Sequence, residues 1–133
     1  MGEKILIVDD DRFIRELYEE VLRGEGYDLE TAVDGKDGLE KLQKGGYDLV
    51  LLDIMMPKID GLQVLDQLSK NPPQKPNGPI VVLTNINHDP IIDEATKKGS
   101  HAYLAKAEMT PGELVESVKK FLEQERLSTE SKK

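Results

Sequence analysis

Three runs of four consecutive apolar residues constrain the fold of this chain more than any other feature. They occupy residues 5–8, 49–52 and 80–83. An uninterrupted run of this length is typical of a strand that is buried on both faces, as in a parallel sheet. Between these runs, apolar residues recur at the spacing of amphipathic helices. The alternation predicts an α/β fold, with a parallel sheet covered by helices on both faces.

Two weaker strands and five helices complete the expected pattern. Residues 27–31 alternate between apolar and polar side chains, which suits a strand at the edge of a sheet, and residues 102–105 form a fifth strand. Helices are expected over residues 13–22, 35–44, 61–68, 90–98 and 111–122. One domain is therefore predicted over residues 1–127. The apolar pattern fades from about Glu123, and residues 128–133 are expected to form a disordered polar tail.

Composition excludes several classes of function. The chain has 133 residues, enough for one ordinary domain, and a net charge of -8, which argues against direct binding to nucleic acid. It has no cysteine, so disulfides, thiolate metal sites and cysteine nucleophiles are excluded. No apolar run approaches the roughly 20 residues of a membrane helix, and no signal peptide is recognisable. A cytoplasmic protein without membrane contact is expected.

Polar side chains follow four of the predicted strands, where each strand ends. Asp9 and Asp10 follow the first strand, Asp53 the third, Thr84 the fourth and Lys106 the fifth. In a parallel sheet the carboxyl ends of all strands lie at one edge, where ligands of such folds bind. Any one of these residues alone is most often a helix cap or a solvated strand end. The prediction of a site rests on their occurrence together.

The chemistry of this set suits phosphoryl transfer. Crowded carboxylates repel one another unless a cation lies among them, and carboxylate oxygens with water are the ligands that Mg²⁺ prefers. Lys106 would add positive charge and Thr84 a hydrogen-bond donor for the oxygens of a phosphoryl group. Asp53 would be the nucleophile that accepts this group.

Two other enzyme or carrier classes fit the sequence less well. A flavodoxin-like cofactor carrier would need a loop rich in Ser, Thr or Gly after the first strand, whereas three aspartates stand at 9–11. A phosphatase with an aspartate nucleophile typically carries both the nucleophile and its acid–base partner after the first strand, with added cap elements. Here the candidate nucleophile follows the third strand, and the chain has no room for a cap.

Four motifs, taken together and in order, resemble the receiver domain of two-component response regulators. They are ILIVDDD, DLVLLDIMMPKIDG, VVLT and AYLAK, and the resemblance extends from about Lys4 to Leu122. It implies a single doubly wound (βα)5 domain of the chemotaxis type, with a five-stranded sheet in the order 2-1-3-4-5. It also implies a regulatory protein, whose only catalysis is its own aspartyl phosphorylation and dephosphorylation.

The resemblance assigns roles by position. Asp53 would be the phosphoacceptor and would bind Mg²⁺ together with Asp10 and the backbone carbonyl of Met55. Asp9 would act on the metal through water. Thr84 and Lys106 would hold the phosphoryl oxygens.

Thr84 and Tyr103 would act as the switch, altering the face made by the fourth helix, fifth strand and fifth helix. The implied partners are a sensor histidine kinase or phosphotransfer protein, and then a protein target, a fused output domain or a second copy in a phosphorylation-dependent homodimer. A pseudo-receiver, which keeps the fold but binds partners without phosphorylation, is the alternative.

Three positions depart from the family pattern or bear on the lifetime of the phosphate. Ala107 follows Lys106 where the family usually has a proline joined by a cis peptide, so the loop geometry there is open. Met55 and Ile86 flank the expected path of hydrolytic water, and neither side chain can orient a water molecule. Slow loss of phosphate without outside help is therefore expected.

Overall fold

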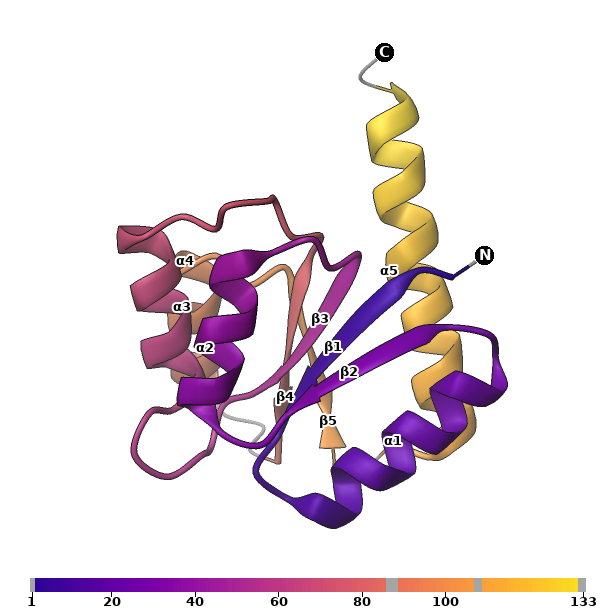
Figure 1. Ribbon diagram of the computed structural model, residues 1–133, viewed down its shortest axis with the longest axis horizontal. Helices are drawn as coiled ribbons and strands as arrows, with labels where there is room; N and C mark the ends of the chain where they lie inside the picture. Colours follow the sequence, from indigo (N-terminus) through magenta and orange to yellow (C-terminus); the bar gives the residue numbers. More distant parts are fainter. Residues whose placement is uncertain (1, 86–88, 107–108, 132–133) are drawn as a thin grey trace.

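The computed structural model of the chain describes residues 2–85, 89–106 and 109–131. Five strands alternate with five helices, as the sequence predicts (Figure 1). The strands are β1 (Lys4–Val8), β2 (Asp28–Ala32), β3 (Leu49–Asp53), β4 (Ile80–Thr84) and β5 (Ala102–Ala105). The helices are α1 (Arg12–Gly24), α2 (Gly35–Lys44), α3 (Gly61–Lys70), α4 (Asp89–Lys97) and α5 (Pro111–Ser131).

All five strands are parallel, in the order β2-β1-β3-β4-β5, which confirms the predicted topology. Their register aligns the carboxyl ends of neighbouring strands. Val8 lies opposite Leu52, Asp53 opposite Leu83, and Thr84 opposite Ala105. The residues that follow these positions therefore meet at one edge of the sheet.

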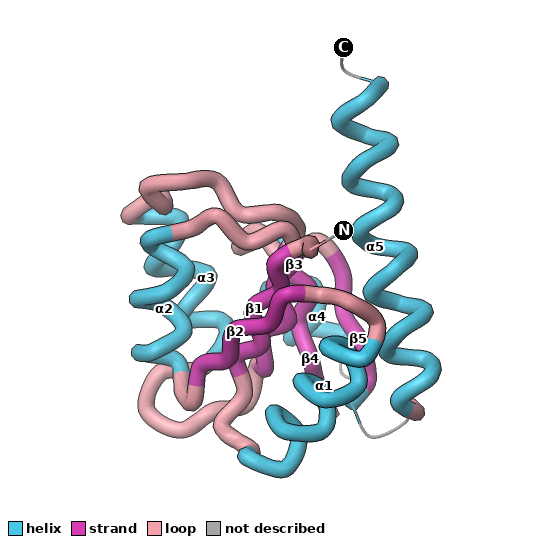
Figure 2. The backbone as a smooth tube through the Cα atoms, turned by 45° about the vertical axis from the view of Figure 1, so that its right-hand side comes forward, coloured by secondary structure: helices cyan, strands magenta, loops and turns pink. Residues whose placement is uncertain are grey.

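Helices cover both faces of the sheet. Helices α1 and α5 lie on one face, and α2, α3 and α4 lie on the other (Figures 1 and 2). Successive residues of β1 alternate between two buried clusters: Ile5 and Ile7 pack with α1 and α5, whereas Leu6 and Val8 pack with the opposite helices. This explains why residues 5–8 of β1 are apolar at every position, since both faces of this strand are buried.

Side chains cap the starts of several helices. Asp60 accepts a hydrogen bond from the Gln63 N–H, and the Gln63 side chain accepts one from the Asp60 N–H, so α3 begins with a complete capping box. Thr110 and Glu113 form the same reciprocal pair before α5. The Asp34 side chain accepts from the Asp37 N–H at the start of α2. These bonds satisfy backbone donors that have no partner within the helix.

Helix α5 is longer than its apolar pattern indicates. Its last fully buried side chain is Val118, yet the helix continues to Ser131, and its end projects beyond the rest of the molecule (Figures 1 and 2). Residues 128–131, which the sequence assigns to the polar tail, continue this helix in the structure. Neither glycine nor proline, which would break a helix, occurs among them. Residues 132–133 lie outside the described part of the chain. Nowhere in that described part is a helix long and apolar enough to cross a membrane.

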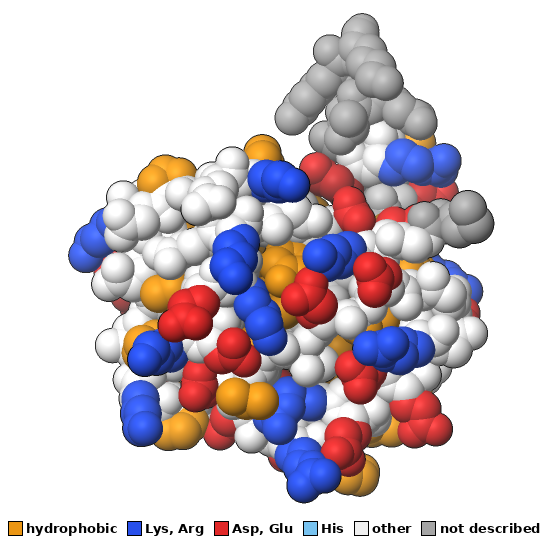
Figure 3. Space-filling model, in the orientation of Figure 1, with side chains coloured by type: hydrophobic (Ala, Val, Ile, Leu, Met, Phe, Trp, Pro, Cys, Tyr) orange, Lys and Arg blue, Asp and Glu red, His pale blue; other side chains and the backbone are white. Residues whose placement is uncertain are grey.

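Charged side chains of both signs are mixed on the surface. On the face shown in Figure 3, the described Lys and Arg side chains lie among Asp and Glu side chains without forming a large field of one sign. Surface ion pairs include Lys4 with Glu30 at 2.8 Å and Lys41 with Asp37 at 3.5 Å. Pairs of this exposed kind contribute little to stability, typically about 0–1 kcal/mol each.

Candidate functional site

The strand-end residues converge at the carboxyl edge of the sheet, as the sequence predicts. Asp53 is the last residue of β3, and Asp9 directly follows β1, its neighbour in the sheet. Thr84 ends β4 and is buried. Lys106 follows β5 and reaches back over the sheet edge to both acids. Residues almost 100 positions apart therefore form one site.

Asp9 and Lys106 form a buried ion pair at the centre of the site. The Lys106 Nζ lies 2.7 Å from the Asp9 Oδ2 and 3.4 Å from the Asp53 Oδ2. The side chain of Asp9 is fully buried, and those of Asp53 and Lys106 are 4% and 8% exposed. Removing one partner from such a buried pair leaves an uncompensated charge and is strongly destabilising. Lys106 is therefore the cation that allows two acids to be buried together.

A metal ion fits the acids of this edge. One carboxylate oxygen each from Asp9, Asp10 and Asp53 lies within 4.8 Å of the others. Asp10 is exposed, so the group opens to solvent on one side. The Asp9 Oδ2 is buried and has no hydrogen bond, although it faces Lys106. Oxygen donors of this charge and spacing suit a hard divalent cation that keeps some of its waters.

The environment of Asp53 disfavours its charged form. Burial, followed by the negative charge of Asp9, raises the pKa of the Asp53 carboxyl to about 7, although Lys106 and the Met55 N–H oppose this. Burial also lowers the pKa of Lys106, but its contacts with Asp9 and then Asp53 outweigh burial, so the pKa lies above its ordinary value. Lys106 therefore stays protonated. Additional positive charge beside Asp53, such as a bound metal ion, would lower the pKa of the Asp53 carboxyl.

The loop after β3 fixes the position of Asp53. The Met55 N–H donates to the Asp53 Oδ1 at 3.2 Å, and the Gly61 N–H donates to the Ile54 carbonyl at 2.9 Å. A side-chain carbon at Gly61 would lie 2.6 Å from the Asp53 carbonyl oxygen, so only glycine lets α3 start this close. Lys58 turns the loop with a φ of 67°, a conformation that costs energy for a residue other than glycine.

Tyr103 lies apart from the acids. It is in the middle of β5, opposite Val82 of β4, and its side chain is 44% exposed. The acids and Lys106 thus form one cluster, while Tyr103 sits on an outward-facing surface of an edge strand. Ile86 and Ala107, which bear on the water path and on the loop after Lys106, lie outside the described residues.

One residue of the site did not emerge from sequence reasoning. The Arg15 Nη1 donates to the backbone carbonyl oxygen of Asp9 at 2.7 Å. Arg15 is in the first turns of α1, and long side chains on a helix lean toward its N-terminus. Arg15 stands one turn into the helix that follows Asp9 at the end of β1. A basic residue at that position is the signal that could have suggested the contact.

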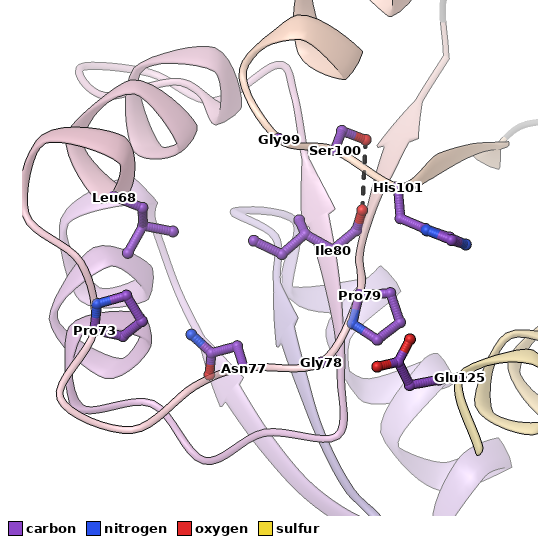
Figure 4. Close-up of a pocket in the computed structure, with 10 residues that line it drawn as sticks. All are labelled: Leu68, Pro73, Asn77, Gly78, Pro79, Ile80, Gly99, Ser100, His101 and Glu125. Carbon is purple, nitrogen blue, oxygen red and sulfur yellow. Dashed lines mark hydrogen bonds between the residues drawn. The ribbon is translucent and has the colours of Figure 1, made fainter. Parts of the chain in front are cut away.

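A pocket of about 510 Å³ lies at the opposite edge of the sheet (Figure 4). Its wall includes Leu68, Pro73, Ile80, His101 and Glu125. Ile80 begins β4, and His101 directly precedes β5, so the pocket lies at the amino ends of the strands. It contains one carboxylate and no side-chain ammonium in its wall. The acid cluster is therefore the better candidate for a functional site.

The fold and the site together define a doubly wound α/β domain with an acid-lined site at the carboxyl ends of its strands. The response regulator receiver domain model matches residues 5–119. The chain therefore belongs to the response regulator receiver domain family. This confirms the resemblance that the four motifs indicate, and membership supports a phosphorylation-dependent role in signalling.

Regulatory proteins are among the relatives of the chain. It is 35% identical over 131 residues to the alkaline phosphatase synthesis transcriptional regulatory protein PhoP of Bacillus subtilis, covering 98% of this chain and 53% of PhoP. It is 30% identical over 121 residues to the chemotaxis protein CheY of Thermotoga maritima, covering 90% of this chain and 98% of CheY. The chain thus spans about half the length of one relative and nearly all of the other.

A solved structure has the same fold. The CheY-like response regulator receiver domain protein of Methanospirillum hungatei superimposes with a TM-score of 0.84 at 28% sequence identity. The match covers 96% of this chain and 99% of that one. The likeness therefore includes the whole sheet, both helical layers and the edge that carries the acids.

Proposed function

We propose that this protein is a phosphorylation-activated switch of a two-component system, in which Asp53 accepts a phosphoryl group from a histidine kinase or phosphotransfer protein. The observation that carries the proposal is the pairing of Lys106 with both Asp9 and Asp53 at the strand ends. An ammonium 3.4 Å from a buried carboxylate is well placed to hold an oxygen of a group that becomes attached to it.

The transfer step needs only Asp53 as nucleophile. One oxygen of its carboxylate attacks the phosphorus of the donor phosphohistidine while the donor P–N bond breaks. The imidazole nitrogen keeps the electron pair of that bond and takes up a proton. The Met55 N–H, which donates to the Asp53 Oδ1, leaves the Oδ2 on the side of Lys106 as the attacking atom.

The neighbours of Asp53 would neutralise the charge that accumulates on the phosphoryl oxygens. Lys106 can move from Asp9 to one of these oxygens, because its Nζ already lies between the two acids. Thr84 would donate its hydroxyl to another oxygen. Asp10, Asp53 and the Met55 carbonyl would hold Mg²⁺, with Asp9 acting through water. The bound ion would supply positive charge to both the carboxylates and the phosphoryl group.

The switch would link this edge to a surface of the molecule. Thr84 and Tyr103 lie in adjacent strands, β4 and β5. A shift of Thr84 toward the phosphoryl group would make room for the Tyr103 side chain to turn inward, and the face of α4, β5 and α5 would change. The new charge thus biases an element that has two arrangements.

The proposal includes the surroundings of the protein. We place it in the cytoplasm, without membrane contact or direct binding to nucleic acid. Residues 1–127 form the receiver domain. The changed face would bind a protein target, a fused output domain or a second phosphorylated copy. The protein would catalyse only the gain and loss of its own phosphoryl group.

Phosphorylation can be tested directly by mass. The protein is incubated with Mg²⁺ and a small acyl phosphate, and the intact mass is measured for the wild type and for Asp53→Asn. One added phosphoryl group on the wild type and none on the variant is the expected result. Addition to both proteins would assign the acceptor to another residue.

The same measurement distinguishes the pseudo-receiver. Absence of any adduct on the wild type, with the acyl phosphate and with a phosphorylated histidine-containing donor, would contradict the proposed switch. The domain would then act as an interaction module that does not need phosphorylation.

A further inference from the structure

We infer that Arg15 is a positioning residue for the metal site, which it serves by fixing the peptide group between Asp9 and Asp10. This inference rests on the Mg²⁺ site of the proposed function. Its basis is the 2.7 Å hydrogen bond from the Arg15 Nη1 to the Asp9 carbonyl oxygen, in a partly buried setting. A guanidinium group makes such a charge-assisted bond stronger than a neutral donor would.

The Asp9 carbonyl and the Asp10 N–H belong to one planar peptide group. The hydrogen bond from Arg15 to the carbonyl oxygen therefore fixes the orientation of the peptide group that leads into Asp10. The other polar groups of Asp9 are also held. Its N–H donates to the Ala32 carbonyl at 3.2 Å, its Oδ1 accepts from the Asp11 N–H at 2.9 Å, and its Oδ2 faces Lys106. Arg15 supplies the remaining contact, on the side of Asp10.

Asp10 depends on this backbone more than the other two acids do. It is exposed, and in the described part of the chain its carboxylate makes no hydrogen bond or ion pair. Asp53, by contrast, is held by the Met55 N–H and by Lys106. Without a side-chain partner, Asp10 is held in place by its backbone alone, and the peptide plane sets the position from which its carboxylate rotates. Arg15 thus orients a ligand that it does not touch.

Arg15 has no competing partner among the described residues. It makes no ion pair there, whereas Arg12, three residues earlier, pairs with Glu16 at 2.9 Å on the exposed face of α1. The two arginines carry the same charge near the same acidic edge. Only Arg15 contacts the backbone of the site. Arg12 is therefore a matched control for the loss of a positive charge.

The direction in which Mg²⁺ affinity changes when Arg15 is replaced distinguishes a positioning role from electrostatic repulsion of the metal. A positive charge near a cation site repels the cation, so removal of a charge alone should tighten Mg²⁺ binding. Loss of a group that orients a ligand should weaken it, typically at least tenfold for residues that support metal ligands. The two explanations predict opposite changes at Arg15.

The experiment is a calorimetric Mg²⁺ titration of the unphosphorylated full chain at fixed ionic strength. For Arg15→Gln we expect about tenfold weaker binding, and for Arg12→Gln a change of less than about twofold. Arg15→Lys keeps the charge and one donor, so its affinity should lie between those of the wild type and Arg15→Gln. Thermal unfolding with a chelator, and then with Mg²⁺, is measured alongside. A merely structural Arg15 would lower both melting temperatures equally, whereas a positioning residue reduces the gain on adding Mg²⁺.

The outcomes are distinct. Arg15→Gln that binds Mg²⁺ as tightly as the wild type, or more tightly, overturns the inference and leaves the proposed function intact. A wild type that binds no Mg²⁺ at millimolar concentration overturns the metal site itself, and the inference with it. Should Arg15→Gln fail to fold, Arg15→Lys decides the question, because wild-type affinity in that variant contradicts a role for the geometry of the guanidinium.

Discussion

Asp53 combines two demands that conflict at the level of a single residue. A nucleophile must be ionised, but Asp53 is buried beside Asp9, which raises its pKa to about 7. Lys106 relieves part of this conflict through its contact with the carboxylate at 3.4 Å. The site therefore holds destabilising negative charge that a bound cation would neutralise. Two consequences can be measured on the residues themselves.

The first prediction concerns Asp53→Asn and pH. A carboxyl group whose pKa is raised on folding binds protons more tightly in the folded state, so its stabilising effect is lost as pH rises from about 4 to 7. The wild type with a chelator should lose stability over this range, and Asp53→Asn should lose less. At pH 7.5 the variant should be more stable by about 1–4 kcal/mol. Urea unfolding at both ends of the range measures this.

Mg²⁺ provides the control for that prediction. The ion should stabilise the wild type at pH 7.5 more than it stabilises Asp53→Asn, because the variant lacks one of the proposed ligands. Equal slopes of stability against pH for the two proteins would contradict the assignment of the raised pKa to Asp53.

The second prediction concerns Lys106→Met, which keeps most of the length of the side chain and removes its charge. The Lys106 ammonium lies 2.7 Å from the Asp9 carboxylate and 3.4 Å from that of Asp53, a proposed Mg²⁺ ligand, so it competes with the metal for negative charge. The variant should therefore bind Mg²⁺ more tightly, by roughly three- to tenfold, while the metal-free protein loses about 3 kcal/mol of stability. Calorimetry and unfolding with a chelator report the two effects. Weaker Mg²⁺ binding would show that Lys106 orders the acids more than it competes with the metal.

At the scale of elements, the ends of strands and the starts of helices decide the geometry of the site. β3 ends at Asp53, and α3 begins at Gly61, where the backbone passes close to Asp53. The capping box of Asp60 and Gln63 fixes where α3 starts. The position of the carboxylate therefore depends on the junction between the strand and the helix that follows it.

The third prediction concerns Gly61→Ala, with Gly112→Ala as its control. A side-chain carbon at Gly61 would lie 2.6 Å from the Asp53 carbonyl oxygen and 2.8 Å from the Ile54 Cα, whereas one at Gly112 would meet no atom closer than 4.0 Å. Gly61→Ala should cost about 1–3 kcal/mol and slow phosphorylation. Gly112→Ala in α5 should stabilise by up to about 1 kcal/mol. Chemical unfolding measures both, and equal stability of the two variants would contradict the close approach at Gly61.

The elements also show how far sequence could predict this structure. All five strands and their order follow from apolar runs, helical spacing and the family resemblance. The meeting of Asp9, Asp10 and Asp53 follows because parallel strands end at one edge. The length of α5 could not be predicted from the sequence. The apolar pattern that marks a helix fades before its last turns, and no glycine or proline there indicates where the helix ends.

The contacts within the site were also beyond sequence reasoning. The sequence gives no reason why Asp9 should be buried against Lys106 while Asp10 is exposed. That difference depends on the directions of the two side chains in the loop after β1, which residue types alone do not specify. The contact of Arg15 with the Asp9 carbonyl could not be predicted for a similar reason. Every residue has a backbone carbonyl, so the sequence does not show which one accepts a side-chain hydrogen bond.

At the scale of the whole molecule, the acid cluster and the proposed output face are parts of one sheet. The carboxyl ends of β1 and β3 carry the acids, and β5 is an edge strand two positions from β3. A change at Asp53 can reach β5 through β4, which lies between them in the sheet, or through Lys106, which follows β5 and contacts the Asp53 carboxylate. Since β4 is buried along most of its length, the sheet transmits a discrete rearrangement more readily than a gradual one.

The last prediction tests this link through the exposure of tyrosines. Tyr103 is 44% exposed, whereas Tyr18 and Tyr47 are buried, and Tyr27 is half-buried at the opposite edge of the sheet. Phosphorylation of Asp53 should reduce nitration of Tyr103 by roughly twofold or more, as its ring turns inward. The modified peptides are quantified by mass spectrometry, with Tyr27 as an internal reference. Asp53→Asn treated with the same donor should not change. A loss of nitration that Tyr27 shares would indicate general tightening of the fold, and unchanged Tyr103 in a fully phosphorylated sample would exclude Tyr103 as the switch.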